Sequence, residues 1–235
     1  TGAGKSLCFL IPALIIPGIT LIIYPLLALM ADQHRRMLDA NISCVIFRGN
    51  QSVEERNNNF QKITDGAKII IANPEVLQNN DLTDRLSKIN ISHIAIDEAH
   101  CISEWGHDFR PEYRRIRPII NEIDQAPVIA LTATATDKVR MDIKKSLGMT
   151  NAVEYKNSFN RPNLYYEVRP KTKEVDKQII KFIKSNQGKS GIIYCLSRKK
   201  VEELAAVLQA NDIRAEAYHA GLDTVTRNET QDKFL

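Results

Sequence analysis

Short runs of β-branched and aliphatic residues alternate with amphipathic stretches along the first half of the chain. The apolar runs lie at 20–25, 44–47, 68–73, 93–98 and 128–133, and helical periodicity is clearest between them at 27–41 and 53–66. Runs that are almost continuously apolar are typical of parallel strands buried on both faces of a sheet. Regular alternation of strand and helix therefore predicts an α/β fold, a doubly wound parallel sheet with helices on both faces.

A second α/β unit is expected after a polar connection at 156–173, which contains two prolines. The pattern beyond it predicts strands at 164–169, 190–195 and 214–220, helices at 175–188 and 198–211, and the start of another helix. Three strands are fewer than a complete sheet normally has. We therefore expect a first domain at 1–155 and an incomplete second domain at 174–235. The chain begins at Thr1 without a methionine, which indicates a fragment of a longer protein.

Composition narrows the class of protein. Hydrophobic residues make up 43% of the chain and charged residues 26%, the balance of a globular domain. The apolar stretch at 7–30 is interrupted by three prolines and a glycine, so it cannot form one membrane-spanning helix. Four cysteines without a Cys-x-x-Cys pair disfavour a disulfide framework or a zinc knuckle and favour a reducing cytosol. A net charge of +4 fits either a polyanionic partner or an ordinary solvated surface.

The chain opens with TGAGKS, a glycine-rich turn that leads into a helix. Backbone N–H groups in such a turn, together with the positive end of the helix dipole, surround phosphate oxygens. Lys5 is then placed to reach the β- and γ-phosphates of a nucleotide, and the hydroxyl of Ser6 to ligate Mg²⁺. The alternative is a glycine turn that only caps an ordinary helix, since the first glycine of the complete pattern would precede Thr1.

Two carboxylates follow one of the expected buried strands, in the sequence IAIDEAH. Open α/β sheets bind ligands at the carboxyl ends of their strands, so Asp97 is placed to hold Mg²⁺. Glu98 is placed to orient and deprotonate an attacking water. The same pair would suit other metal hydrolases, or would only cap a helix. A phosphate loop upstream in the same alternating unit favours the hydrolysis of a nucleotide.

The next residues, CISEWGHDFRPEY, contain the only tryptophan of the chain. Trp105 and Phe109 offer flat faces to nucleobases, and stacking contributes about 1–3 kcal/mol per base in proteins that bind single strands. Arg110 is able to reach a phosphate or a neighbouring carboxylate. Such a loop would report bound nucleic acid to the hydrolytic site beside it. The alternative is that both aromatic side chains lie in the core beneath a helix.

Six segments, taken in order, closely resemble the RecQ family of DNA helicases: TGAGKSLCFLIPAL, PLLALMADQ, DEAHCISEWGHDFRPEY, LTATAT, NRPNLYY and IIYCLSRKKVE. The most specific part is the aromatic continuation of DEAH, which generic DEAD/DEAH helicases lack. The resemblance implies two RecA-like domains, ATP and Mg²⁺ as cofactors, and single-stranded DNA and DNA duplex junctions as partners. The implied activity is ATP-dependent 3′-to-5′ translocation and unwinding in DNA recombination and repair, at the nucleoid if the source is bacterial.

The resemblance also implies roles for individual residues. The residues expected to bind the nucleotide are Thr1, Gly2, Ala3, Gly4, Lys5 and Ser6. The expected Mg²⁺ ligands are Ser6 and Asp97. Hydrolysis falls on Lys5, Asp97, Glu98 and His100. The residues expected to couple nucleic-acid binding to ATP hydrolysis are Gln33, Ser103, Trp105, His107, Asp108, Phe109, Arg110, Thr132, Thr134, Ser197 and Arg198. His219 and the NPE segment at 73–75 match further family positions.

Some features depart from the family pattern or lie outside the chain. Tyr24 stands where the family usually has a small residue such as serine. The arginine motif of the second domain would lie beyond Leu235, and an arginine finger contributes roughly 10³–10⁵ in rate. We therefore expect the 235-residue chain alone to hydrolyse ATP negligibly. Two other functions stay open, a DEAH-type RNA helicase and an ATP-gated nucleic-acid binding switch that does not unwind.

Overall fold

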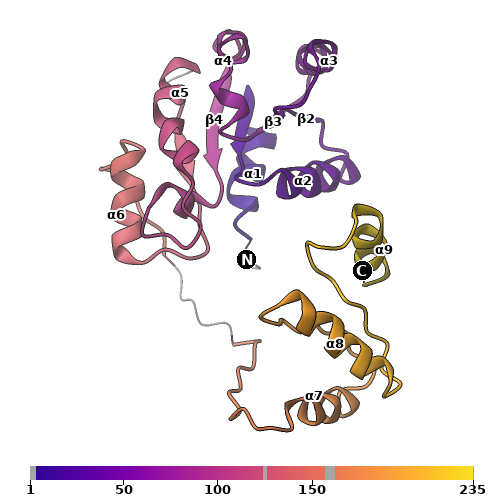
Figure 1. Ribbon diagram of the computed structural model, residues 1–235. Coiled ribbons are helices and arrows are strands. Elements are labelled where there is room, and N and C mark those ends of the chain that lie inside the picture. The colour runs from indigo at the N-terminus through magenta and orange to yellow at the C-terminus, as the bar shows by residue number, and fades with distance from the viewer. Residues whose placement is uncertain (1–3, 124–125, 157–161, 235) are drawn as a thin grey trace. The chain divides into compact units, whose positions relative to one another are not determined.

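The computed structural model describes residues 4–123, 126–156 and 162–234, and the chain forms two compact units, at 1–156 and 157–235 (Figure 1). The strands of the first unit are β1 (Ile19–Ile23), β2 (Cys44–Ile46), β3 (Ile69–Ala72), β4 (Ile91–Ile96) and β5 (Val128–Ala130). Its α-helices are α1 (Leu7–Ile15), α2 (Leu27–Asp39), α3 (Val53–Thr64), α4 (Asn80–Leu86), α5 (Ile116–Ile123) and α6 (Asp137–Ser146). Short 3₁₀ helices are at Val76–Gln78, Ala99–Ile102 and Pro111–Arg115.

The strands of the first unit form one five-stranded sheet in the order β2-β3-β1-β4-β5, and all pairs of neighbours are parallel. Side chains alternate between its faces: Leu21 and Ile23 join a core with residues of α3 to α6, whereas Ile22 joins a core with residues of α1 and α2. The expected α/β sheet with helices on both faces is confirmed for this unit.

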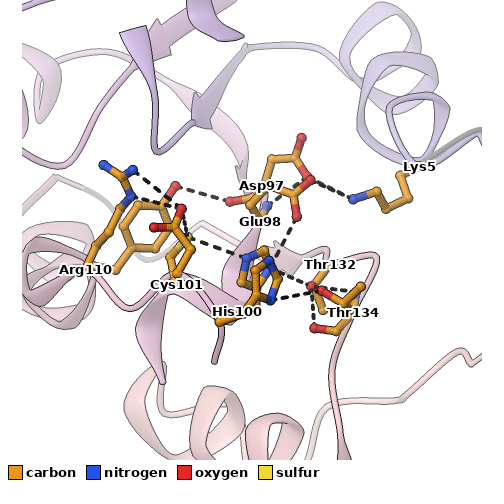
Figure 2. A network of polar contacts seen from close by, with 11 residues as sticks. Lys5, Asp97, Glu98, His100, Cys101, Arg110, Thr132 and Thr134 are labelled. Carbon is orange, nitrogen blue, oxygen red and sulfur yellow. Dashed lines mark hydrogen bonds and ion pairs between the residues drawn. The ribbon is translucent and has the colours of Figure 1, made fainter. Parts of the chain in front are cut away.

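The observed strands lie within a few residues of the expected runs. The largest difference is at β5, which ends at Ala130, although the apolar pattern continues to 133. The hydroxyl of Thr132 accepts a hydrogen bond from the backbone N–H of Thr134 at 3.2 Å, and this local bond turns the chain away from the sheet. The turn brings the Thr132 side chain toward the end of β4, where Asp97 and Glu98 follow (Figure 2).

The second unit contains α7 (Val175–Lys184), α8 (Arg198–Gln209) and α9 (Thr224–Phe234). Helices were expected at all three places, the last as the start of a further helix, and α7 contacts α8. The prediction of strands at 164–169, 190–195 and 214–220 is wrong for this chain, because the described residues of the second unit include no strand. An extended segment becomes a strand only when a neighbour pairs with its backbone. Among residues 162–234 these segments have no such neighbour, and Val168, Tyr194 and Leu196 are exposed.

No α-helix in the described ranges is both long enough and apolar enough to cross a membrane.

Candidate functional site

Lys5 and the two carboxylates meet at the carboxyl end of β4. Ala95 of β4 faces the core formed with α1 and α2, and the two-residue period of the strand points Asp97 to the same side. Lys5 lies just before the first residue of α1 on this side. Its Nζ lies 3.1 Å from Oε1 of Glu98 and 3.7 Å from Oδ1 of Asp97 (Figure 2). The ion pair joins segments that lie 93 residues apart in the sequence.

The backbone at the acidic pair is held in an unusual conformation. Glu98 has a φ of +47°, in the left-handed region that residues other than glycine rarely adopt. Its backbone N–H donates to Oδ1 of Asp97 at 2.8 Å. The buried hydroxyl of Tyr113 donates to the carbonyl oxygen of Asp97 at 3.2 Å. These bonds fix the turn that directs both carboxylates toward Lys5.

The two carboxylates differ in electrostatic environment. Burial raises the pKa of Asp97, although the charge of Lys5 opposes this shift. The hydrogen bond with His100, assisted by Lys5, lowers the pKa of Glu98 from 4.5 to about 2. Glu98 is therefore ionised at neutral pH, in the form that orients a water or pairs with a cation.

His100 connects the acidic pair with the segment after β5. Its Nδ1 lies 3.2 Å from Oε2 of Glu98 and 2.9 Å from Oγ1 of Thr132. Thr132 also donates to the carbonyl oxygen of Thr134 at 3.3 Å. A chain of polar contacts thus runs from Lys5 through Glu98 and His100 to the TAT segment, as Figure 2 shows.

The loop after the acidic pair folds back onto His100. The ring of His107 stacks on the ring of His100, with centroids 4.2 Å apart and planes inclined by 19°. Nδ1 of His107 also lies 3.5 Å from Oγ1 of Thr134. Ser103 is fully buried and accepts a hydrogen bond from the N–H of Trp105 at 3.3 Å. At Gly106, a Cβ would collide with the carbonyl oxygen of His100, so the tight return of the loop requires glycine.

The far end of the loop is tied by Arg110. Its Nε lies 3.4 Å from Oδ2 of Asp108, and its Nη1 donates to the carbonyl oxygen of Pro25 at 3.1 Å. Of the two partners expected for Arg110, a phosphate or a neighbouring carboxylate, the structure shows the carboxylate, that of Asp108. Arg110 also borders an open groove of about 510 Å³, which is lined by Pro25, Leu26, Leu27, Ala28, Asn73 and Glu75 as well.

The two aromatic side chains of the loop lie at the surface to different extents. The side chain of Trp105 is 64% exposed, so the alternative that it lies in the core is wrong. The ammonium of Lys138 lies 3.0 Å from the centroid of its ring. Phe109 is half-buried, and the guanidinium of Arg114 lies 5.3 Å from its ring centroid.

Other expected site residues are not joined to this network. Thr1, Gly2 and Ala3 lie outside the described residues, and Gly4 directly precedes Lys5 with a φ of +72°. Gln33 is half-buried on α2, and no described hydrogen bond links it to the acidic pair. In the second unit, Ser197 caps α8 by accepting from the N–H of Lys200 at 3.2 Å. A Cβ at Gly221 would lie 3.0 Å from Arg198 and 3.2 Å from His219, so these two side chains lie together there.

Three residues are placed in ways that the sequence did not indicate. Tyr113 supports the acidic pair, yet its only signal was its place in a distinctive segment. Cys101 is buried between His100 and Asp108, at 3.9 Å from each, and burial raises the pKa of its thiol to about 12. Tyr24 is buried rather than directed to the surface, so it is not placed to contact a bound strand.

The fold of the first unit is that of a RecA-like α/β domain. Solved structures of two helicases share the fold. The DUF1998 helicase MrfA bound to DNA and AMPPNP has a TM-score of 0.69 at 21% identity, and the comparison covers 99% of this chain and 36% of MrfA. The Pyrococcus furiosus Hef helicase domain has a TM-score of 0.53 at 22% identity, covering 90% of this chain and 49% of that one.

The chain belongs to the DEAD/DEAH box helicases and, within them, to the RecQ family. The DEAD/DEAH box helicase family model matches residues 1–142. The ATP-dependent DNA helicase RecQ of Haemophilus influenzae is 42% identical over 235 residues, which are 100% of this chain and 38% of the relative. The Bacillus subtilis protein of the same name is 40% identical over 237 residues, 100% of this chain and 40% of the relative. The chain thus spans about two fifths of the length of these relatives.

Proposed function

We propose that this chain is the motor region of a 3′-to-5′ DNA helicase of the RecQ type, which couples ATP hydrolysis to single-strand translocation and duplex unwinding in recombination and repair. The observation that carries the proposal is the continuous contact path from Lys5 and Glu98 through His100 to His107 in the aromatic loop. An RNA helicase would need the hydrolytic residues, but not this loop, whereas an ATP-gated nucleic-acid clamp differs from a helicase in that it does not unwind a duplex. We assign residues 174–235 to the start of a second RecA-like domain.

The ion pair between Lys5 and Glu98 suggests how ATP activates the site. Phosphate oxygens would compete with Glu98 for the ammonium of Lys5, which lies 3.1 Å from the carboxylate. Losing this cation raises the basicity of Glu98, whose pKa of about 2 is partly due to Lys5. Glu98 then orients the attacking water and accepts its proton more readily. Lys5 meanwhile offsets the charge that develops on the transferred phosphoryl group.

Oxygen ligands suited to Mg²⁺ are present beside Lys5. Asp97 supplies a carboxylate, and the hydroxyl of Ser6 makes no capping hydrogen bond to α1, so it is free to act as a ligand. Mg²⁺ typically takes one or two protein oxygens together with phosphate oxygens and water, and Ser6 and Asp97 would hold it in this way. When bound, the ion would neutralise charge on the phosphates.

Coupling to DNA follows from the loop contacts. A strand that stacks on Trp105 would shift the loop, and His107 would transmit the shift to His100 through their stacked rings. Nδ1 of His100 lies within reach of both Glu98 and Thr132, so a small rotation changes its bond to Glu98. Bound DNA would thus adjust the carboxylate that orients the attacking water.

The proposal is tested by phosphate release from the full-length protein without nucleic acid, with single-stranded DNA and with RNA. Wild type should be stimulated by DNA. Trp105→Ala should need about 5- to 150-fold more DNA for the same stimulation, the equivalent of one lost stacking interaction. Stimulation by RNA alone would identify an RNA helicase instead.

A strand-separation assay on the same preparations completes the test. DNA-stimulated hydrolysis without unwinding of a duplex with a 3′ single-stranded tail would identify an ATP-gated clamp. Equal loss of basal and DNA-stimulated hydrolysis in Trp105→Ala would show that Trp105 supports the fold rather than the coupling.

A further inference from the structure

Lys138 covers one face of the only tryptophan in the chain. Its ammonium nitrogen lies 3.0 Å from the centroid of the Trp105 ring, within the range of a cation–π interaction. The Trp105 side chain nevertheless remains 64% exposed. An indole has two faces, so a lysine on one of them leaves the other open to solvent and to a nucleobase.

Lys138 belongs to an element that is itself well fixed. It lies in the first turn of α6, which begins at a cap where Thr136 accepts from the N–H of Val139 at 3.4 Å. Val139 and Ile143 anchor the helix in the core, and α6 contacts the 3₁₀ helix Ala99–Ile102 beside the acidic pair. Lys138 is therefore a firm support for a side chain on a loop.

Arg114 links the residue before Trp105 to the same helix. The guanidinium of Arg114 pairs with Glu104, next to Trp105, at 3.0 Å and reaches Asp142 of α6 at 4.0 Å. Trp105 is thereby tied to α6 through Lys138, and its neighbour Glu104 through Arg114. These contacts favour one orientation of the indole before any strand binds.

We propose that Lys138 is a positioning residue for Trp105: it holds the indole by a cation–π contact so that the opposite face accepts one base of a single strand. The inference rests on the proposed role of Trp105 in DNA binding. Lys138 acts through the indole, not through a phosphate of the strand. Losing a cation–π contact at an exposed site should weaken DNA binding about two- to five-fold.

The test is a double-mutant cycle on the 235-residue chain, in which affinity for a single-stranded oligonucleotide is measured at several salt concentrations. The variants are Lys138→Gln, Trp105→Ala and the two combined, with Lys138→Arg as the conservative change. Lys145→Gln, an exposed lysine of the same helix, removes the same charge and is the matched control. Far-UV circular dichroism confirms that each variant is folded.

We expect Lys138→Gln to weaken binding two- to five-fold when Trp105 is present and to have no further effect in Trp105→Ala. Lys138→Arg and Lys145→Gln should bind as the wild type does. The slope of log affinity against log salt should stay unchanged. Without DNA, Lys138→Gln should also brighten the emission of Trp105, because an ammonium against an indole quenches its fluorescence.

Two results would overturn the inference while the role of Trp105 stands. One is wild-type affinity and emission in Lys138→Gln. The other is equal weakening in both backgrounds with a salt slope reduced by about 0.7, the mark of a direct phosphate contact. If Trp105→Ala binds DNA as the wild type does, the proposed DNA-binding loop itself fails.

Discussion

Glu98 combines an unusual backbone conformation with contacts to three other residues of the site. Its left-handed backbone, with a φ of +47°, costs free energy that the surrounding contacts must offset. In return, its N–H meets the carboxylate of Asp97 while its own carboxylate reaches Lys5 and His100 at once. A regular helical or extended backbone at this position would separate these partners. The strain therefore lies at the residue that we assign to water activation.

The first prediction concerns the titration of Glu98. Because its folded-state pKa is lowered to about 2 from 4.5, its ionised form stabilises the protein above about pH 4.5. This stabilisation is lost as the pH falls toward 2. His100→Ala removes the largest cause of the shift, so the pKa of Glu98 should rise toward its ordinary value. The unfolding midpoint of the variant should then depend less steeply on pH in this window, as thermal melts at a series of pH values will measure.

The Glu98→Gln background provides the control, because it has no carboxylate to titrate at this position. There, His100→Ala should lower the midpoint through lost packing but leave its pH dependence between 2 and 4.5 unchanged. An unaltered slope for His100→Ala in the wild-type background would mean that His100 does not set the pKa of Glu98.

Individual side chains were predicted unevenly from the sequence. The meeting of Lys5 with Asp97 and Glu98 follows from a glycine-rich turn and a strand end, and both signals are local. The stacking of His107 on His100 depends on a tight return at Gly106, which no sequence periodicity encodes. The sequence also left undecided whether Trp105 is exposed or buried, because this depends on how the loop folds back.

At the scale of elements, a buried polar cluster joins α1 to the sheet. His93 of β4 lies with Nε2 3.3 Å from the carbonyl oxygen of Phe9 in α1, and with both ring nitrogens 3.4 Å from Oγ1 of Thr20 in β1. Ser92 adds a contact of 3.0 Å to Nδ1. Since α1 begins directly after Lys5 and Ser6, the cluster fixes the helix that carries the phosphate-binding residues.

We predict that His93→Leu lowers both stability and nucleotide affinity. The variant leaves the buried hydroxyl of Thr20 and the Phe9 carbonyl without their histidine partner, which costs about 1–3 kcal/mol for a buried polar group. A less firmly held α1 should also weaken ATP binding through Lys5. Urea unfolding and nucleotide titration measure the two effects on the same preparation.

His93→Gln is the matched comparison, because an amide retains both a donor and an acceptor at this place. It should recover part of the stability and of the affinity. If His93→Leu loses stability but binds nucleotide as the wild type does, the cluster supports the core without positioning α1.

The strands of the first unit were predictable because β1, β3 and β4 are buried on both faces and read as apolar runs, and α2 and α3 between them each show one apolar side. The expected run at 93–98 included Asp97 and Glu98, whereas β4 ends at Ile96 and both carboxylates directly follow it. The short 3₁₀ helices escaped prediction, because three to five residues are too few to show periodicity. In the second unit, apolar runs of the same kind form no strands in the structure, which shows that pairing partners matter as much as pattern.

At the scale of the whole molecule, the two units differ in how much apolar surface they bury. The first has core residues on both faces of its sheet. In the described part of the second, the buried side chains are Leu204, Ala205 and Leu208 of α8, and α7 buries none. An α/β unit gains its stability from burying helices against a sheet. The second unit therefore depends on further pairing for the RecA-like fold that we propose.

The last prediction follows from this difference and uses amide hydrogen exchange read by mass spectrometry. In the 235-residue chain, segments 164–169, 190–195 and 214–220 should exchange rapidly, because their backbone has no ladder of hydrogen bonds. Strands β1, β3 and β4 should be protected in the same sample and serve as the internal control. In the full-length protein the three segments should become protected too, since a completed second sheet would pair them. Rapid exchange in both forms would contradict a second RecA-like domain, whereas protection in the 235-residue chain would show that the segments are already paired there.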